Sequence, residues 1–327
     1  MRFVWLAVVV LASCNRKHGD AYKIEQVATS GASACAVMKD GSLRCWGKGA
    51  NALIPTVVPG VSDAASVCVT DRFECIRHMD GRVSCIGAAF GEAHGASAVA
   101  CNKEQVCVIA GADVLCATET QPFHVIAGAK GAATIAAGGG TTCVTFPDGT
   151  AKCWGRGTEG QLGNGHFENR DNPDAIALFD VRSISVGDEH TCAVLHDETV
   201  VCFGADDDGQ LGDAHSQPSA TPHRVDGVAI ATEVTCGAHH TCAHMGDSTV
   251  RCWGKNDVHQ ASVTNDTHIP VATLLSGLYE ADNVTAGDDF TCARMRDGWL
   301  RCVGVNDWGQ LGDGTTEVRN VPTPIRY

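Results

Sequence analysis

A pair of cysteines that recurs seven times is the feature that most constrains how this chain folds. Eight or nine residues separate the two members of each pair. The pairs are Cys35 with Cys45, Cys75 with Cys85, Cys107 with Cys116, Cys143 with Cys153, Cys192 with Cys202, Cys242 with Cys252, and Cys292 with Cys302. The last four pairs repeat every 49 or 50 residues, a period typical of propellers, solenoids and other repeat arrays. The chain is therefore expected to fold as a series of similar units.

The spacing within a pair predicts a β-hairpin closed by a disulfide. Between Cys35 and Cys45, an Asp-Gly sequence stands in the middle of an alternating apolar pattern. A three-residue loop over residues 39–41 places the two cysteines opposite each other in a non-hydrogen-bonded pair, where side chains are close enough for a disulfide. A zinc site does not fit, because structural zinc ligands are usually two to four residues apart.

Variant copies test this hairpin register. The copy from Cys107 to Cys116 is one residue shorter and has Gly-Ala at residues 111–112, which suits a two-residue loop and again pairs the cysteines. Two other loops have Glu198 and Ser248 where the remaining long copies have glycine. These two turns are expected to be strained or differently shaped, because the position favours a left-handed backbone.

The N-terminus indicates export, which suits a chain with 18 cysteines. Arg2 is followed by an apolar run over residues 3–11 that is too short to span a bilayer permanently. Residues 11–14, Leu-Ala-Ser-Cys, resemble the lipobox of bacterial lipoproteins. The resemblance implies a signal peptide over 1–13, lipidation of Cys14, and a polar tether over 14–23 before the repeats of 24–327. An ordinary secretory signal is the alternative, and it also predicts export.

The repeats resemble the regulator of chromosome condensation repeat family. His-Thr-Cys-Ala begins the hairpins at His190 and His240, Cys-Trp-Gly ends several of them, and Gly-Gln-Leu-Gly follows at 160–163, 209–212 and 309–312. The resemblance covers about 24–327 and is strongest from 134, whereas the copies within 61–120 lack Gly-Gln-Leu-Gly.

The family resemblance implies an all-β fold, a seven-bladed β-propeller of four-stranded antiparallel blades. One hairpin disulfide is expected in each blade. The strand over residues 321–325 is expected to close the ring by completing the first blade, which removes an exposed sheet edge.

Besides Cys14, three cysteines lie outside the seven pairs. Cys101 and Cys236 stand six residues before a hairpin cysteine, and Cys68 stands seven before, so all three are expected on strands near the central channel. Cys68 and Cys101 belong to adjacent copies and are candidates for an extra disulfide. Cys236 is then left alone, and we interpret it as a small buried side chain rather than a reactive thiol.

The clusters that could suggest metal binding have structural interpretations, and we expect neither a metal nor a cofactor. His190 and His240 occupy a repeat position, which favours a scaffold role over a metal site, while His239 and His244 are irregular. The acidic run at 206–208 lacks the spacing of a calcium loop and is interpreted as an exposed turn.

Charge and motifs favour a binding module over an enzyme. A formal charge of −14 argues against nucleic acid as a partner. No phosphate loop, nucleophile elbow or metalloprotease motif is present, so no catalytic residue is assigned. The variable segments around 156–180, 204–228 and 254–281 are expected to hold a protein or glycan, with Trp299 and Trp308 as candidate contacts because they lie off the repeat register.

The sequence thus predicts a monomeric, lipid-anchored binding or scaffold protein of the cell envelope, attached to the membrane through its N-terminal lipid. A hydrolase or lyase with a site at the channel mouth is one alternative. A purely structural lipoprotein is the other.

Overall fold

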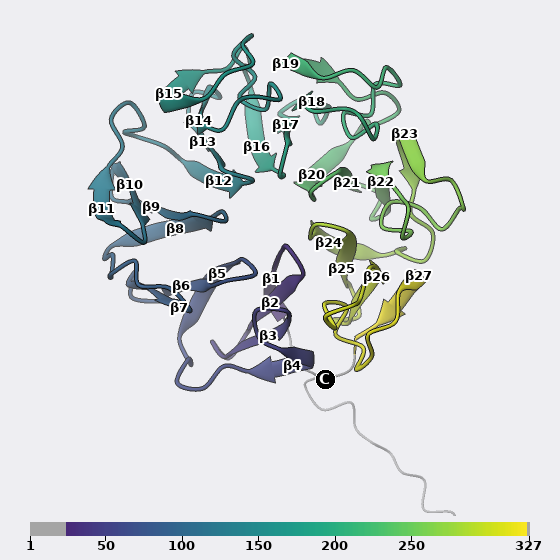
Figure 1. Cartoon of the computed structure of the whole chain (residues 1–327), viewed down its shortest axis with the longest axis horizontal. Helices are drawn as coiled ribbons and strands as arrows, with labels where there is room; N and C mark the ends of the chain where they lie inside the picture. The colour runs from purple at the N-terminus through teal and green to yellow at the C-terminus, as the bar shows by residue number, and fades with distance from the viewer. Residues whose placement is uncertain (1–23, 326–327) are drawn as a thin grey trace, which may run out of the picture.

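The repeats form seven radial sheets around a central axis (Figure 1). The computed structural model describes residues 24–325, and 27 strands occur in this part of the chain. Within the same residues there is no helix long and apolar enough to cross a membrane. The seven-bladed propeller expected from the repeats is therefore confirmed.

Each blade is a run of consecutive strands, ordered from the channel outward. The first three blades are β1 (Ile24–Ser30), β2 (Ser33–Met38), β3 (Leu43–Gly47) and β4 (Ala52–Val57); β5 (Ala64–Val69), β6 (Glu74–His78) and β7 (Val83–Ile86); and β8 (Ala96–Cys101), β9 (Gln105–Ala110), β10 (Asp113–Thr118) and β11 (Gln121–Val125). The fourth and fifth are β12 (Thr134–Gly138), β13 (Thr141–Thr145), β14 (Ala151–Gly155) and β15 (Arg170–Ala175); and β16 (Val181–Val186), β17 (His190–Leu195), β18 (Val200–Gly204) and β19 (Ser219–Arg224). The last two are β20 (Ala231–Cys236), β21 (His240–Met245), β22 (Val250–Lys255) and β23 (His268–Leu274); and β24 (Ala281–Ala286), β25 (Phe290–Met295), β26 (Leu300–Gly304) and β27 (Arg319–Pro324).

The second blade departs from the expected four strands. It has three strands, and an isolated bridge between Val83 and Ala93 takes the place of the fourth. The segment after β7 contains Gly87, Gly91 and Gly95, all with positive φ, so its backbone turns repeatedly instead of extending. The other six blades have the four antiparallel strands that the resemblance implied.

A hairpin disulfide joins the second and third strands in every blade. Cys35 lies opposite Cys45 in the strand register, and their Cα atoms are 4.1 Å apart, the close spacing of a non-hydrogen-bonded pair. The same register and spacing hold for the shorter copy, Cys107 with Cys116. The remaining hairpin disulfides are Cys75–Cys85, Cys143–Cys153, Cys192–Cys202, Cys242–Cys252 and Cys292–Cys302.

The turns of the longer hairpins keep one shape whether or not they contain glycine. Gly41 has a φ of 81°, and its N–H donates to the carbonyl of Met38. Glu198 and Ser248 occupy the same position with φ values of 65° and 67°, and each donates the equivalent hydrogen bond. These two turns are thus strained, as expected, but they are not differently shaped.

Neighbouring blades are joined by contacts that explain why the sequence motifs occur together. The hydroxyl of Thr241, from His-Thr-Cys, and the indole Nε1 of Trp253, from Cys-Trp-Gly, both donate to the carbonyl of Gln210 at 2.9 Å. Gln210 belongs to the Gly-Gln-Leu-Gly segment of the preceding blade, and the indole packs where a Cβ on Gly212 would lie. Each motif is therefore one side of a blade-to-blade contact.

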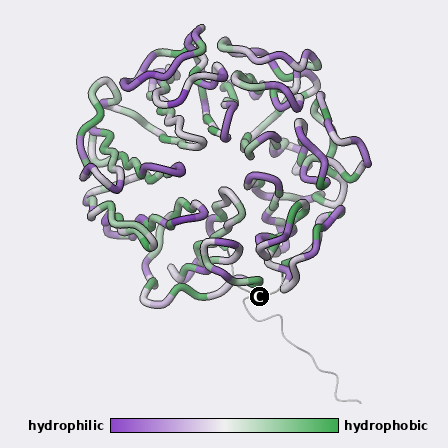
Figure 2. Tube along the Cα trace, viewed as in Figure 1, coloured by the Kyte–Doolittle hydropathy of each residue, from purple (hydrophilic) through white to green (hydrophobic). Residues whose placement is uncertain are grey.

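The hydrophobic core is divided among the spaces between blades. One cluster combines Val194 and Leu211 of the fifth blade with Val234 and Trp253 of the sixth. Figure 2 shows hydrophobic and hydrophilic residues interspersed along all the blades rather than gathered in one central core.

Ring closure differs from the expectation. β27 pairs with β26, so the C-terminal strand completes the seventh blade and not the first. The first blade has its own fourth strand, β4, because the repeat begins with the innermost strand at Ile24. The ring is closed without a shared strand: Trp46 Nε1 donates to the carbonyl of Gln310 at 2.9 Å, the same contact that Trp253 makes with Gln210.

Candidate functional site

The propeller has two unlike faces. We call one the long-loop face; it carries the turns between the first and second strands and the loops between the third and fourth, such as 156–169, 205–218 and 305–318. We call the other the hairpin face; it carries the disulfide-closed hairpin turns, such as 39–41, and the connections between blades, such as 176–180.

The innermost strands line a channel of about 310 Å³. Its wall combines small apolar side chains with polar ones, among them Thr29, Ser185 and Thr235. Near its hairpin-face end, Asn283 Nδ2 donates to both carboxylate oxygens of Glu233, at 2.9 and 2.7 Å. Burial raises the pKa of Glu233, although the hydrogen bond from Asn283 opposes that rise.

On the long-loop face, the channel mouth carries three carboxylates and one ammonium. Asp71, Lys103, Asp188 and Asp288 occupy one repeat position, the turn between the first and second strands of their blades. Lys103 Nζ forms an ion pair with Asp188 Oδ2. Asp288 Oδ1 accepts the N–H of Gly31 at 2.9 Å, which joins the seventh blade to the first.

The carboxylates at the mouth influence one another. Burial raises the pKa of Asp288 to about 6, and repulsion from Asp188 adds to this effect while Lys103 opposes it. Burial disfavours the charge of Lys103, yet its hydrogen bond to Asp188 leaves the pKa of the ammonium above its ordinary value. Lys103 pairs with one of the three carboxylates and Lys48 with a second, so the mouth keeps an excess of negative charge that suits a cationic group from a partner.

The acidic mouth continues to the rim of the same face through Lys48. Asp71 accepts the N–H of Ala32 at 2.7 Å and pairs with Lys48 Nζ at 3.2 Å. The same ammonium lies 5.5 Å from the ring centroid of Trp308, which is 52% exposed. Trp308 is thus part of one continuous surface with the mouth.

The long loops are fixed at their bases and exposed at their tips. A side-chain oxygen of Asp206 accepts the N–H of Leu211 at 2.8 Å, and Asn306 holds Leu311 in the same way at 2.9 Å. Asp206 is fully buried, so the expected exposed turn at 206–208 is wrong for its first residue. Phe167, at a loop tip of the fourth blade, is 53% exposed.

The repeated histidines are buried between blades. His190 Nε2 lies 2.8 Å from Thr241 Oγ1, and His240 Nε2 lies 2.9 Å from Thr291 Oγ1. Because Thr241 and Thr291 donate their hydroxyl protons to backbone carbonyls, each histidine donates from Nε2. Burial lowers the pKa of His190 to about 3 and that of His240 to about 4, so both are neutral links in the scaffold.

The irregular histidines make separate contacts. His244 Nδ1 bonds to the hydroxyl of Thr232, while His239 Nδ1 lies 3.5 Å from a carboxylate oxygen of Asp208. They do not converge with His190 or His240 in any metal-ligating group found within residues 24–325.

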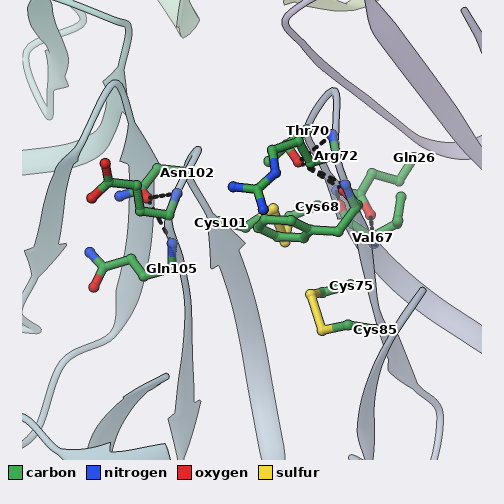
Figure 3. The surroundings of a disulfide bond; sticks show 12 residues. Gln26, Val67, Cys68, Thr70, Arg72, Cys75, Cys85, Cys101, Asn102 and Gln105 are labelled. Carbon is green, nitrogen blue, oxygen red and sulfur yellow. Dashed lines mark hydrogen bonds between the residues drawn. A yellow bond between two sulfur atoms is a disulfide. The ribbon is translucent and has the colours of Figure 1, made fainter. Parts of the chain in front are cut away.

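The cysteines outside the hairpins lie on innermost strands. Cys68 and Cys101 form a disulfide that links the second blade to the third (Figure 3). Cys236 is buried and free, and burial raises the pKa of its thiol to about 12. It lies within 4.8 Å of potential ligand atoms of His190 and Cys192, but Cys192 is already bonded to Cys202.

The two candidate tryptophans lie on opposite faces. Trp299 ends the hairpin turn before β26, and Trp308 follows the other end of that strand. They therefore cannot belong to one contact patch. Cys14, the predicted lipidation site, lies outside the described residues.

Sequence reasoning missed the residues of the channel mouth. Asp71, Lys103, Asp188 and Asp288 are far apart in the chain and look like ordinary turn residues within their own repeats. When the repeats are aligned on Cys35, Cys75 and their equivalents, all four residues fall in one column, four residues before the first cysteine of the hairpin. This column is the sequence signal that could have identified them.

Family models match the middle of the chain. Two models of the regulator of chromosome condensation (RCC1) repeat match, one at residues 148–194 and 197–244, the other at 132–161, 181–210 and 231–260. No curated protein sequence matches the chain at a significant level.

Solved structures share the fold at low sequence identity. Prp20p from Saccharomyces cerevisiae is 18% identical over 93% of this chain and 77% of its own, with a TM-score of 0.64. Human WBSCR16 is 16% identical over 94% of this chain and 82% of its own, with a TM-score of 0.66. The ectodomain of the receptor kinase CR4 from Physcomitrella patens is 20% identical over 86% of this chain and 73% of its own, with a TM-score of 0.60. At these identities the likeness concerns the fold alone.

Proposed function

Because this chain is a β-propeller built from regulator of chromosome condensation (RCC1) repeats, we propose that it is a binding module of the cell envelope. It is anchored through a lipid on Cys14 and holds a protein partner on its long-loop face. The partner presents a basic segment to the channel mouth and an apolar or aromatic group to the rim at Trp308.

The acidic channel mouth is the observation that carries this proposal. Asp71, Asp188 and Asp288 converge there from blades far apart in the sequence. Attraction between charges of opposite sign orients an approaching partner and raises its association rate. The same carboxylates repel an acidic partner.

The loops around the mouth supply a preorganised surface. Their bases are held by buried polar side chains such as Asp206 and Asn306, so little conformational entropy is lost on binding. Their tips expose Phe167 and Trp308, and aromatic residues of this kind are enriched among the anchors of protein interfaces.

The fold supports a binding role by analogy. The solved structure of Prp20p is described together with its binding properties to Gsp1p and histones. Such a likeness extends to this chain only as a proposal, because function does not follow from fold.

Site-specific photo-crosslinking tests the proposal. A photoreactive amino acid replaces Trp308 in one protein and Phe179, on the hairpin face, in a matched control. In intact envelopes, position 308 is expected to capture one protein species that position 179 does not. Equal capture at both positions, or none at 308, would contradict a partner on the long-loop face.

The captured partner then allows the acidic mouth to be measured. With the purified partner, Trp308→Ala and Asp288→Asn are each expected to raise Kd about tenfold or more, while Trp299→Ala leaves it unchanged. The Asp288→Asn effect should shrink at high salt, because screening weakens the charge attraction. The intact mass of the chain from native membranes reports the lipid at Cys14 separately.

A further inference from the structure

The described chain begins on the hairpin face. Ile24 lies opposite Met38 in the register of β1 and β2, and Met38 directly precedes a hairpin turn. Arg294 Nη1 donates to the carbonyls of Ile24 and Glu25, at 3.1 and 2.6 Å. Arg294 in turn lies opposite Leu300, so the start of β1 is held beside the hairpin that carries Trp299.

The same face carries a ring of exposed apolar side chains, which we call the apolar ring. Its members expose between 40% and 75% of their surface: Met79, Phe179, Ile230, Tyr279 and Trp299. Backbone hydrogen bonds place each connection between blades beside a hairpin turn, because Asp180, Ile230 and Glu280 each accept an N–H from the hairpin turn of the following blade. The members on the connections therefore lie on the same face as those on the hairpins.

The reach of the preceding segment decides which face a lipid on Cys14 would meet. Nine residues lie between Cys14 and Ile24, and the ten residue-to-residue steps span at most about 35 Å when fully extended. To pass the rim, it must cross three strand spacings, about 14 Å, and then the depth of a blade, about 20 Å. A fully extended tether would therefore be used up at the far rim, whereas the hairpin face lies directly beside its attachment point.

From this placement we propose that the hairpin face lies against the membrane, with the apolar ring in the headgroup region. This inference rests on the lipid anchor of the proposed function and adds the orientation. Trp, Tyr and Phe side chains are suited to this depth, because they combine large apolar surface with tolerance of a polar boundary. The long-loop face and its acidic mouth then point away from the bilayer, where a partner can reach them.

The charges of the hairpin face specify zwitterionic lipid. Six of the seven hairpin turns carry an aspartate, and these are Asp40, Asp80, Asp148, Asp197, Asp247 and Asp297. Hydrogen bonds from the following residues lower the pKa of Asp40, Asp148, Asp197 and Asp247, so these carboxylates stay charged and hydrated. Repulsion from anionic headgroups therefore favours phosphatidylcholine or phosphatidylethanolamine surfaces.

Trp299 and Trp308, the two exposed tryptophans among residues 24–325, can report the orientation. Trp46, Trp154 and Trp253 are buried and contribute a constant background to the emission. In Trp308→Phe the exposed reporter is Trp299 on the hairpin face, and in Trp299→Phe it is Trp308 on the long-loop face. The mature protein, with its lipid verified by intact mass, is reconstituted into phosphatidylcholine vesicles that contain brominated phosphatidylcholine, which quenches fluorescence only at short range.

Quenching of Trp299, with the emission of Trp308 unchanged, is the expected result. Replacing both Phe179 and Tyr279 with Asp should abolish that quenching. The matched control is Phe167→Asp, an exposed phenylalanine on the opposite face from Phe179, and it should leave the quenching intact. Near-ultraviolet circular dichroism of each variant verifies folding.

Other outcomes overturn the orientation. Quenching of Trp308, or equal quenching of both reporters, would mean that the hairpin face does not select the membrane. No quenching in a lipidated protein would mean that the apolar ring is free for a protein partner instead.

Failure of the lipid anchor gives a different signature. If the native chain carries no lipid, the lipid anchor of the proposed function is wrong. Whether the hairpin face binds a membrane is then tested separately, by coupling Cys14 of the mature chain to a maleimide phospholipid. Cys236 does not compete, because it is buried. The same quenching pattern supports the membrane-facing surface, and its absence rejects it.

Discussion

Asp206 is a buried carboxylate at a position where neighbouring repeats have asparagine. Asn256 and Asn306 each accept an N–H five residues later in the chain, as Asp206 does. Burial raises the pKa of Asp206 from 3.8 to about 6, against the opposing hydrogen bond from Leu211. The loop geometry therefore requires the oxygen, while the negative charge is a cost to folding.

Asp206→Asn is expected to stabilise the protein by about 1–3 kcal/mol at pH 7. The upper limit of this gain in stability corresponds to the full shift in the pKa of Asp206. The gain is reduced because the substitution removes one acceptor for the N–H of Gln217. The amide nitrogen introduced by the substitution can instead donate to Asp213, as Asn306 Nδ2 donates to Asp313 at 3.1 Å. Urea unfolding with the disulfides intact measures the change.

The pH dependence of this gain follows from the sign of the shift. The folded pKa of Asp206 lies above the unfolded value, so the folded state binds more protons between about pH 4 and pH 6 and loses stability as the pH rises through that window. The advantage of asparagine should be complete above pH 6 and absent near pH 4. An equal gain at both pH values would show that the charge of Asp206 is not its source.

Single residues also mark where sequence reasoning reached its limit. Nothing local to either repeat shows that the turns of Asp288 and Lys103 meet at the channel mouth, and only alignment of the repeats puts the two residues in one column. Asp206 was misread for a similar reason: its burial depends on the fold of residues 211–217 over it.

At the level of elements, counting residues predicted most of the hairpins. The position of Asp-Gly fixed the turn, the turn fixed the register, and the register paired Cys35 with Cys45. The fourth strand of the second blade was not predictable in this way. That strand forms only if residues 87–95 extend alongside β7. Their glycines have positive φ, so the backbone turns there instead of extending.

Glu198→Gly is expected to stabilise the fifth blade by about 0.5–1 kcal/mol. Glycine removes the cost of a left-handed backbone, about 1–2 kcal/mol, and part of this gain is offset by the greater entropy of an unfolded glycine. The φ of 65° at Glu198 falls in the relevant region. Thermal unfolding of the oxidised protein reports the difference.

Two variants control for other causes of the Glu198 effect. Gly298→Ala should destabilise by a similar amount, because a Cβ there meets no atom within 4 Å and only the φ of 88° is unfavourable. Ser248→Gly should gain less, since Ser248 Oγ accepts a hydrogen bond from Arg296 at 2.7 Å. A destabilised Glu198→Gly would contradict the strain argument.

For the whole molecule, the repeat count predicted a closed ring but not how it closes. A shared strand was expected, whereas β27 stays in its own blade and the first and last blades meet only through side-chain and loop contacts. No local pattern reveals this choice, because a terminal strand of this kind fits either blade. The position of Ile24 at the start of an innermost strand decides it.

Trp46→Phe is expected to loosen the ring at the seam between the first and seventh blades. The change leaves the buried carbonyl of Gln310 without the indole donor and costs about 1–3 kcal/mol. No peptide connects these two blades directly, so the loss should allow them to separate locally before global unfolding. Hydrogen exchange of backbone amides in β1 to β4 and β24 to β27 measures this opening.

Trp253→Phe provides the matched comparison within the ring. It removes the equivalent 2.9 Å hydrogen bond, to Gln210, between two blades that are also joined by the chain itself. Trp253→Phe should cost less stability in urea, because Thr241 still donates to the carbonyl of Gln210. Faster exchange confined to the terminal blades should occur only with Trp46→Phe. Identical exchange patterns would mean that the seam is as resistant to local opening as any other blade boundary, and that the side-chain contacts alone replace a shared strand.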